Sequence, residues 1–218
     1  MALILNIDTS TNNCSVALSN DDKVIGFAES DSGNHTQVLL PLIKKIINDS
    51  GYSTNDLSAV AVNVGPGSYT GLRVGIATAK GLCYSLNLPL IPVNGPTAMV
   101  NAAIKKNNSA IGTYIVLIDN NRNGWYYGVF DESLKIIIPI GGTNSINDLL
   151  NKIPTKTIYV CSNINELKYD TLSYTHVKCI QGITLNAKLL PPISLINMTV
   201  INPSILVSAQ PFYINSIF

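Results

Sequence analysis

A glycine-rich turn between an apolar strand and a helix is the feature that most constrains how this chain can fold. Residues 59–64 are β-branched and apolar, which predicts a buried strand, whereas residues 72–86 are rich in Ala, Leu, Ile and Gly, which predicts a helix. The glycines of the turn allow positive φ and close backbone approach, and Ser68 or Thr70 can cap the helix. Backbone N–H groups at such a helix start favour an anion or the polar chain of a partner. The residues that define the turn are Gly65, Pro66, Gly67, Ser68, Thr70, Gly71 and Arg73.

Two nucleotide-binding motifs do not fit this turn. A Walker A motif that starts at Gly65 needs a glycine where Thr70 stands, followed by Lys and Ser or Thr, and the phosphate-binding lysine is missing. The Rossmann fingerprint also needs a glycine at that position, and an acid about 20 residues further on. The sequence has no Asp or Glu from Leu57 to Ile118. We therefore expect no dinucleotide site.

The composition indicates a protein that is apolar and weakly charged. The chain has 218 residues, a net charge of +1 and 12% charged residues, whereas an average soluble domain has roughly 25%. Hydrophobic residues make up 46%, but no apolar run approaches the ~18 residues that a membrane helix needs. The first residues lack a basic segment and reach Asp8 too early for a signal peptide, so we expect a cytoplasmic protein without membrane contact. The low charge and high apolarity indicate that another protein covers part of the surface.

The cysteines and histidines do not have the spacing of a metal site. His35 and His176 lie far apart, and no Cys-x-x-Cys pair occurs. We expect reduced thiols that pack as small hydrophobic groups, and we expect neither a metal nor a cofactor. The four cysteines are Cys14, Cys83, Cys161 and Cys179.

The amino-terminal segment has the pattern of a strand that ends in polar groups. Residues 3–7 predict a buried strand that leads into Asp8-Thr9-Ser10, and residues 14–18 and 23–28 predict two strands joined by a turn. This order is typical of the nucleotide-binding half of an actin-like ATPase, in which the acid orients metal or water and the hairpin turn contacts phosphate. An ordinary antiparallel meander, in which Asp8 caps a turn, explains the pattern equally well.

Residues 36–50 predict an amphipathic helix that ends at Gly51 and either starts near Pro41 or bends there. One interpretation is a core helix; the other is a helix with one face on a sheet and a second face on a partner. Each buried Leu or Ile contributes roughly 1.5–3 kcal/mol, so a few on a partner face would sustain a dimer. The apolar positions at helical spacing are Val38, Leu39, Leu42, Ile43, Ile46 and Ile47.

The second half of the chain repeats the pattern of the first. Residues 114–118 predict a strand that ends at Asp119, and a turn containing Arg122 leads to a strand at residues 125–130, as in a duplicated fold. Prolines at 191, 192, 203 and 211 divide the tail into short pieces, which we leave unassigned. The remaining predicted elements are strands at residues 90–93, 136–140 and 157–161, a helix at residues 96–106 and a short helix that Ser145 caps and that runs through Lys152.

Three motifs together resemble the TsaB (formerly YeaZ) family: Asp8-Thr9-Ser10, the run from Gly65 to Gly75, and the strand–Asp119…Arg122–Trp125 hairpin. Members of that family are the non-catalytic subunit in the synthesis of threonylcarbamoyladenosine in tRNA. The resemblance implies an α/β protein with an actin-like ATPase (ASKHA, ribonuclease H-like) fold of two lobes, the second one reduced. We place the lobes at residues 1–109 and 110–218. Departures occur at Asn120-Asn121 in the hairpin and at Pro211-Phe212-Tyr213-Ile214-Asn215 in the tail.

The resemblance also implies partners. The catalytic paralogue, TsaD, would dock on the helices at residues 36–50 and 70–86, and without it the same faces would form a homodimer. A small ATPase, TsaE, is the expected third partner, and tRNA is reached only through the complex. The expected anion contacts are Asp8, Thr9, Asp119 and Arg122. The expected partner interface comprises His35, Val38, Leu39, Leu42, Ile43, Ile46, Leu72, Ile76 and Lys80.

Three other functions fit the residues less well. A small-molecule kinase of the same fold would use Asp8 and Asp119 with an adenine loop such as Gly141-Gly142, but no base lies near the central turn. A zinc protease would need a second histidine where Leu39 stands. As a nucleophile, Ser68 lacks the Gly-x-Ser-x-Gly pattern and has only His35 and His176 to choose from as a base. We therefore keep the expectation that the resemblance implies, a scaffold and activator subunit.

Overall fold

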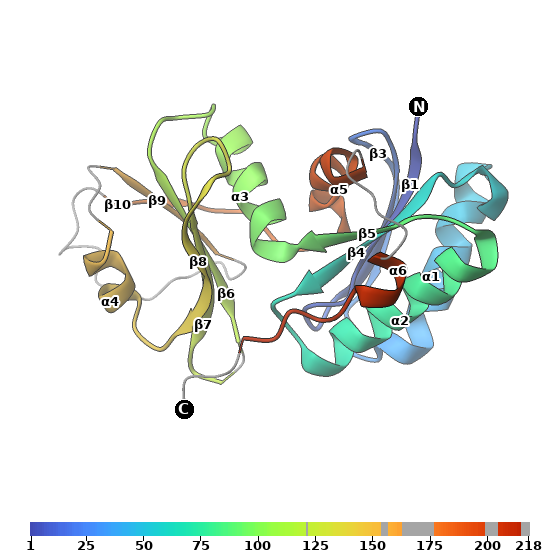
Figure 1. Cartoon of the computed structure of the whole chain (residues 1–218), viewed down its shortest axis with the longest axis horizontal. Coiled ribbons are helices and arrows are strands. Elements are labelled where there is room, and N and C mark those ends of the chain that lie inside the picture. The colour runs from blue at the N-terminus through green and yellow to red at the C-terminus, as the bar shows by residue number, and fades with distance from the viewer. Residues whose placement is uncertain (121, 154–156, 163–176, 199–204, 215–218) are drawn as a thin grey trace. The chain divides into compact units, whose positions relative to one another are not determined.

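The computed structural model describes residues 1–120, 122–153, 157–162, 177–198 and 205–214 (Figure 1). Asn121, His176, Pro203 and Asn215, which the sequence analysis singled out, lie outside these residues. Contacts between Cα atoms divide the chain into two units: Met1–Ala98 with Asn186–Tyr213, and Met99–Leu185 with Ile214. This division differs from the predicted boundary at residues 109 and 110, because the chain after Leu185 returns to the first unit.

The first unit is built on a five-stranded sheet in the order β3-β2-β1-β4-β5. The strands β1, β2 and β3 are antiparallel neighbours, whereas β4 and β5 run parallel to β1. Every residue of β1 and β4 is buried, as their apolar sequences predict. The strands are β1 (Leu3–Asp8), β2 (Cys14–Asn20), β3 (Lys23–Ser30), β4 (Ala59–Gly65) and β5 (Leu90–Asn94).

Helices cover both faces of this sheet. The helix α1 (His35–Ser50) packs on β2 and β3, and α2 (Tyr69–Leu86) packs on β4, with the alternate residues Leu3, Leu5 and Ile7 in their shared core. The intervening residue Asn6 faces the other way, where its Oδ1 accepts a hydrogen bond of 3.0 Å from Ser194 Oγ. The elements that reach the first unit from the tail are η3 (Ala187–Leu189), α5 (Pro191–Met198) and α6 (Ile205–Ser208), and α6 lies against α2 and β5 (Figure 1). The short helix η1 (Thr54–Asp56) leads into β4.

The helix ends follow their predicted caps. Gly51 ends α1 in the left-handed conformation, with φ of 75°, and its N–H donates to Asn48 O. Ser68 rather than Thr70 caps α2, since its Oγ accepts a hydrogen bond of 3.2 Å from Gly71 N. The helix α1 begins at His35, six residues before Pro41. Pro41 therefore lies inside the helix, on its exposed side.

The second unit repeats the strand order of the first. Its sheet runs β8-β7-β6-β9-β10, in which β6, β7 and β8 are antiparallel neighbours and β9 and β10 run parallel to the central β6. The predicted duplication is therefore confirmed. The helix α4 has six residues where α1 has sixteen, in keeping with a reduced second lobe. The elements are α3 (Gly95–Lys106), β6 (Thr113–Asp119), β7 (Trp125–Phe130), β8 (Ile136–Thr143), α4 (Ile146–Asn151), β9 (Ile158–Ser162) and β10 (Val177–Ile180).

Three further expectations can be compared with the structure. All four cysteines are free thiols, and burial raises the pKa of Cys14 and Cys83 to about 11 and that of Cys161 to about 12. Among the described residues, no helix is both long and apolar enough to cross a bilayer. Gly141 and Gly142 lie within β8 and pair with β7, so they do not form the adenine loop that the alternative of a small-molecule kinase would need there.

Candidate functional site

The glycine-rich turn is fastened to the segment that follows β1. Ser68 N donates a hydrogen bond of 2.7 Å to Ser10 O, and Thr9 Oγ1 donates one of 2.7 Å to Gly71 O. Asn63 Nδ2 at the end of β4 donates to Ser10 Oγ at 3.0 Å. The polar residues after β1 and the start of α2 therefore form one hydrogen-bonded unit.

The glycines of the motif let the two segments approach this closely. A Cβ atom at Gly67 would overlap the carbonyl oxygen of Ser10, one at Gly71 would overlap that of Thr9, and one at Gly75 would overlap the Thr9 hydroxyl. Gly65 has φ of 113°, a value that L side chains rarely adopt. The spacing of glycines along the motif therefore has a packing cause inside the chain.

Asp8 is the acid at the centre of this unit, and it is enclosed. Its side chain is 1% exposed, and its Oδ1 accepts hydrogen bonds from Ser10 N at 2.8 Å and Ser10 Oγ at 2.7 Å. The other oxygen, Oδ2, has no hydrogen-bond partner among the described residues. Burial raises the pKa of the Asp8 carboxyl, and the hydrogen bonds from Ser10, the nearby Asn63 amide and the charge of His35 oppose that shift.

The predicted anion contacts fall into two places. Asp8 and Thr9 are buried, Asp8 accepts hydrogen bonds from Ser10 and Thr9 donates one to Gly71 O, so they present no surface to an anion in this structure, contrary to expectation. Asp119 and Arg122 belong to the second unit, at the end of β6 and in the hairpin that follows. Asn120 organises that hairpin, because its Oδ1 accepts hydrogen bonds from Arg122 N at 2.8 Å and Gly124 N at 3.0 Å. The contact at Asp119 and Arg122 stays a prediction.

Replacing Asp8 by Asn should change how the stability depends on pH. Because the pKa of Asp8 is raised in the folded state, the folded protein holds this proton more tightly than the unfolded chain. The free energy of unfolding of the natural protein should therefore fall as the pH rises above the ordinary carboxyl pKa of about 4. The Asp8→Asn variant lacks this loss, so its free energy of unfolding relative to the natural protein should rise from pH 4 to pH 7. Urea unfolding of both proteins at several pH values measures the difference, and a difference that does not depend on pH would contradict the prediction.

His35 and Ser68 have structural partners. His35 Nε2 lies 2.9 Å from Thr11 O, which fixes the start of α1 to the loop between β1 and β2. Ser68 Oγ is used in capping α2, and the described residues contain no group of three His, Cys, Asp or Glu side chains placed to hold a metal ion. The functions of nucleophile and zinc ligand therefore have no support in the described part of the chain.

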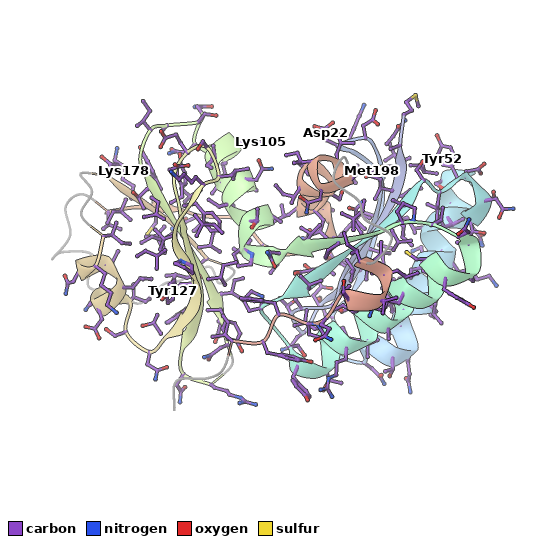
Figure 2. The ribbon with its side chains drawn as sticks, viewed as in Figure 1. Asp22, Tyr52, Lys105, Tyr127, Lys178 and Met198 are labelled. Atoms are coloured by element: carbon purple, nitrogen blue, oxygen red, sulfur yellow. The ribbon has the colours of Figure 1, made fainter. Side chains whose placement is uncertain are left out.

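Most residues of the predicted partner interface are buried or half-buried within the first unit. His35, which was expected at the interface, is buried, Val38 and Leu42 are half-buried, and Lys80 donates a hydrogen bond of 3.0 Å to Val207 O. The apolar stripe of α1 serves the core because the helix covers β2 and β3 with it. Tyr52, which is labelled in Figure 2, follows the C-terminal end of this helix. The correction applies to the buried residues Leu39, Ile43, Ile46, Leu72 and Ile76, which form core and not surface.

The surface of these helices is made by other residues. Leu40 is 57% exposed, in contrast to its neighbour Leu39 at 1%. On α2 the exposed positions recur every three or four residues, as expected for one helical face. The exposed residues are Thr36, Gln37, Leu40, Pro41, Lys44, Lys45, Asn48 and Asp49 on α1 and Tyr69, Thr70, Arg73, Ala77, Gly81, Tyr84 and Ser85 on α2.

The sequence analysis missed the contact between the tail and the motif. Arg73 Nε donates a hydrogen bond of 2.9 Å to Tyr213 Oη, and the Arg73 guanidinium lies 3.9 Å from the centre of the Tyr69 ring. The rings of Tyr69 and Tyr213 have centres 4.9 Å apart. Phe212 N donates to Val64 O at 2.7 Å, next to the turn. The tail therefore completes the site, although its prolines prevented any prediction of its secondary structure from the sequence.

These features define the class of protein. Two units with the same order of strands, each with an acid at the end of its central strand, form an actin-like ATPase (ASKHA) fold, which confirms the predicted fold class. The solved structure of YeaZ from Pseudomonas aeruginosa is similar with a TM-score of 0.77 and 18% identity, over 98% of this chain and 100% of that one. A polyphosphate/ATP-glucomannokinase from Arthrobacter sp. strain KM is similar with a TM-score of 0.52 and 12% identity, over 92% and 99%. At these identities the likeness shows the fold alone.

Sequence comparison identifies the family. The family model described as TsaD, tRNA N6-adenosine threonylcarbamoyltransferase, matches residues 28–143. The tRNA threonylcarbamoyladenosine biosynthesis protein TsaB of Escherichia coli K12 is 44% identical over 106 residues, which are 49% of this chain and 46% of that protein. That of Haemophilus influenzae is 38% identical over 124 residues, or 57% and 52%. The chain thus belongs to the TsaD family and, within it, to the TsaB (YeaZ) family. It spans about half the length of the curated relatives it matches.

Proposed function

We propose that this chain is a non-catalytic subunit in the synthesis of threonylcarbamoyladenosine in tRNA, which binds and activates the catalytic paralogue TsaD. The names of its relatives and the match to the TsaD family support the process. The observation that carries the non-catalytic role is the enclosure of Asp8, Thr9 and Ser10, the polar groups at the end of the central strand. An acid that is to act on a substrate or hold its metal must reach it, and Asp8 is 1% exposed.

The start of α2 also supports a non-catalytic role. In a nucleotide-binding protein a glycine-rich turn presents free backbone N–H groups to phosphate. Here Ser68 N and Gly71 N are both engaged, by Ser10 O and Ser68 Oγ. The hydrogen bonds that phosphate would use are thus partly made by the chain itself. This weakens the alternative of a small-molecule kinase, which equilibrium binding of ATP to the isolated chain would test directly.

Docking through the outer faces of α1 and α2 is the part of the proposal that concerns partners. Leu40 and Pro41 are exposed apolar groups on α1, and Ala77 and Tyr84 are exposed on α2. A homodimer through the same faces is the alternative state of the free chain. The small ATPase TsaE is proposed as the third partner, and tRNA is proposed to bind through the complex.

Co-expression with TsaD of the same organism tests the proposal. We expect the two chains to purify together and the pair, with the small ATPase, to modify tRNA, whereas this chain alone should form no threonylcarbamoyladenosine. Leu40→Asp should abolish co-purification, because it places a charge on the exposed apolar face. Ile111→Asp, at a loop position 81% exposed in the second unit, is the matched control and should retain the complex. Modification of tRNA by this chain alone, with no complex formed, would overturn the proposal.

A further inference from the structure

One flank of α2 and the tail together form an exposed patch of aromatic and cationic side chains. Tyr69, Arg73, Lys80 and Tyr84 follow one another at spacings of four, seven and four residues, so they share one stripe of α2. This stripe is separate from the one that enters the core, which contains Leu72, Ile76 and Ala79. The α2–tail patch consists of the exposed residues Tyr69, Arg73, Tyr84, Val207 and Tyr213 and the half-buried Lys80.

The contacts described above bind the tail to this stripe at both ends. Tyr213 meets Arg73 and Tyr69 near the start of α2, and Val207 O accepts the hydrogen bond from Lys80 two turns further on. Ala209 between them is buried, so the tail is packed rather than merely adjacent. The patch therefore has a fixed shape made from two segments more than a hundred residues apart in sequence.

The patch leaves large apolar groups uncovered. Tyr84 is 84% exposed, Val207 is 83% exposed and Tyr69 is 53% exposed. Scattered exposed apolar residues are ordinary, but several of them gathered on one surface mark an interaction site. Tyrosine and arginine, the residue types most enriched at the energetic centres of protein interfaces, make up most of this patch.

Its two cations are not neutralised within the described part of the chain. The Arg73 guanidinium contacts tyrosine rings and a tyrosine hydroxyl, and the Lys80 ammonium contacts a backbone carbonyl. Sequence neighbours offer no help, since no Asp or Glu occurs from Leu57 to Ile118. A protein that covers the patch without supplying carboxylates would bury two unpaired charges, which is strongly unfavourable.

We propose that the α2–tail patch is a docking surface for a segment of the catalytic subunit that carries acidic side chains among apolar ones. The inference rests on the proposed function, because it names the chemistry by which that partner is recognised. The acidic side chains pair with Arg73 and Lys80, and apolar groups cover Tyr84 and Val207. The tail, held by Tyr213, is then part of the binding surface and not only a closure of the fold.

Binding of purified chain to purified TsaD, measured by titration calorimetry at 50 mM and 300 mM NaCl, tests the inference. The double variant Arg73→Gln, Lys80→Gln should weaken binding about tenfold at low salt, and the gap to the natural protein should narrow at high salt. The control Lys23→Gln, Lys135→Gln removes the same charge from exposed positions elsewhere and should bind as the natural protein does. Arg73→Lys keeps the charge and should retain most of the affinity, which separates a charge effect from loss of the tail contact.

Further variants probe the apolar part and the competing explanations. Tyr84→Ala should weaken binding at both salt concentrations, whereas Tyr52→Ala, also exposed, should not. Thermal melting verifies that each variant is folded. If the charge-neutralised variant binds TsaD as its control does, the inference is overturned. If that variant binds TsaD normally but its complex with TsaD no longer binds tRNA, the patch is a contact for RNA instead. If the natural chain does not bind TsaD at all, the proposed function falls as well.

Discussion

Leu39→Asp should unfold the first unit, although Leu39 was predicted from the sequence to face a partner. The side chain is 1% exposed and lies in the core between α1 and the sheet. Removing a buried leucine side chain costs about 2–5 kcal/mol, and burying a carboxylate there adds further to the loss. A loss of this size approaches the whole stability of a typical domain, about 5–15 kcal/mol. Circular dichroism and urea unfolding measure it.

Leu40→Asp, one position further along α1, is the matched control for stability. Because Leu40 is 57% exposed, its replacement should alter the free energy of unfolding by about 0.5 kcal/mol or less. The pair separates folding from binding: Leu39→Asp loses the complex because the protein is unfolded, and Leu40→Asp loses it while still folded. A Leu39→Asp protein that melts like the natural one would show that the face of α1 in contact with the sheet is wrongly assigned.

The comparison of Leu39 with Leu40 also shows what sequence periodicity can resolve. Apolar residues at helical spacing correctly predict a helix with a wide hydrophobic face. They do not tell which part of that face meets the sheet, because burial depends on how the helix is rotated over β2 and β3. The expected partner interface included residues of the stripe that belong to the core, and only the packed structure assigns them.

Local backbone chemistry was more predictable than side-chain burial. Gly51, Ser68 and Ser145 end or begin helices as expected, because capping depends on neighbours a few residues away. The repeat of a strand, an acid and a hairpin revealed the duplication for the same reason. The partners of Ser10 and Arg73 were not predictable, since Asn63 and Tyr213 come from distant segments.

Gly71→Ala should cause a large loss of stability by separating α2 from the segment after β1. A Cβ atom at Gly71 would overlap the carbonyl oxygen of Thr9, a backbone atom that cannot rotate away. Moving the segments apart would also lengthen the hydrogen bond of 2.7 Å from Thr9 Oγ1 to Gly71 O. We expect the free energy of unfolding to fall by about 3 kcal/mol, at the upper end of what overpacking costs. Urea unfolding measures the change.

Gly81→Ala in the same helix is the control, and its effect should have the opposite sign. A Cβ atom at Gly81 has no neighbour within 4 Å, so the substitution brings only the better helix propensity of alanine. That should raise the free energy of unfolding by about 0.5–1 kcal/mol. If both glycine variants were stabilised alike, the close approach of the motif to Thr9 would not exist in solution. The enclosure of Asp8, on which the non-catalytic role depends, would then lose its structural cause.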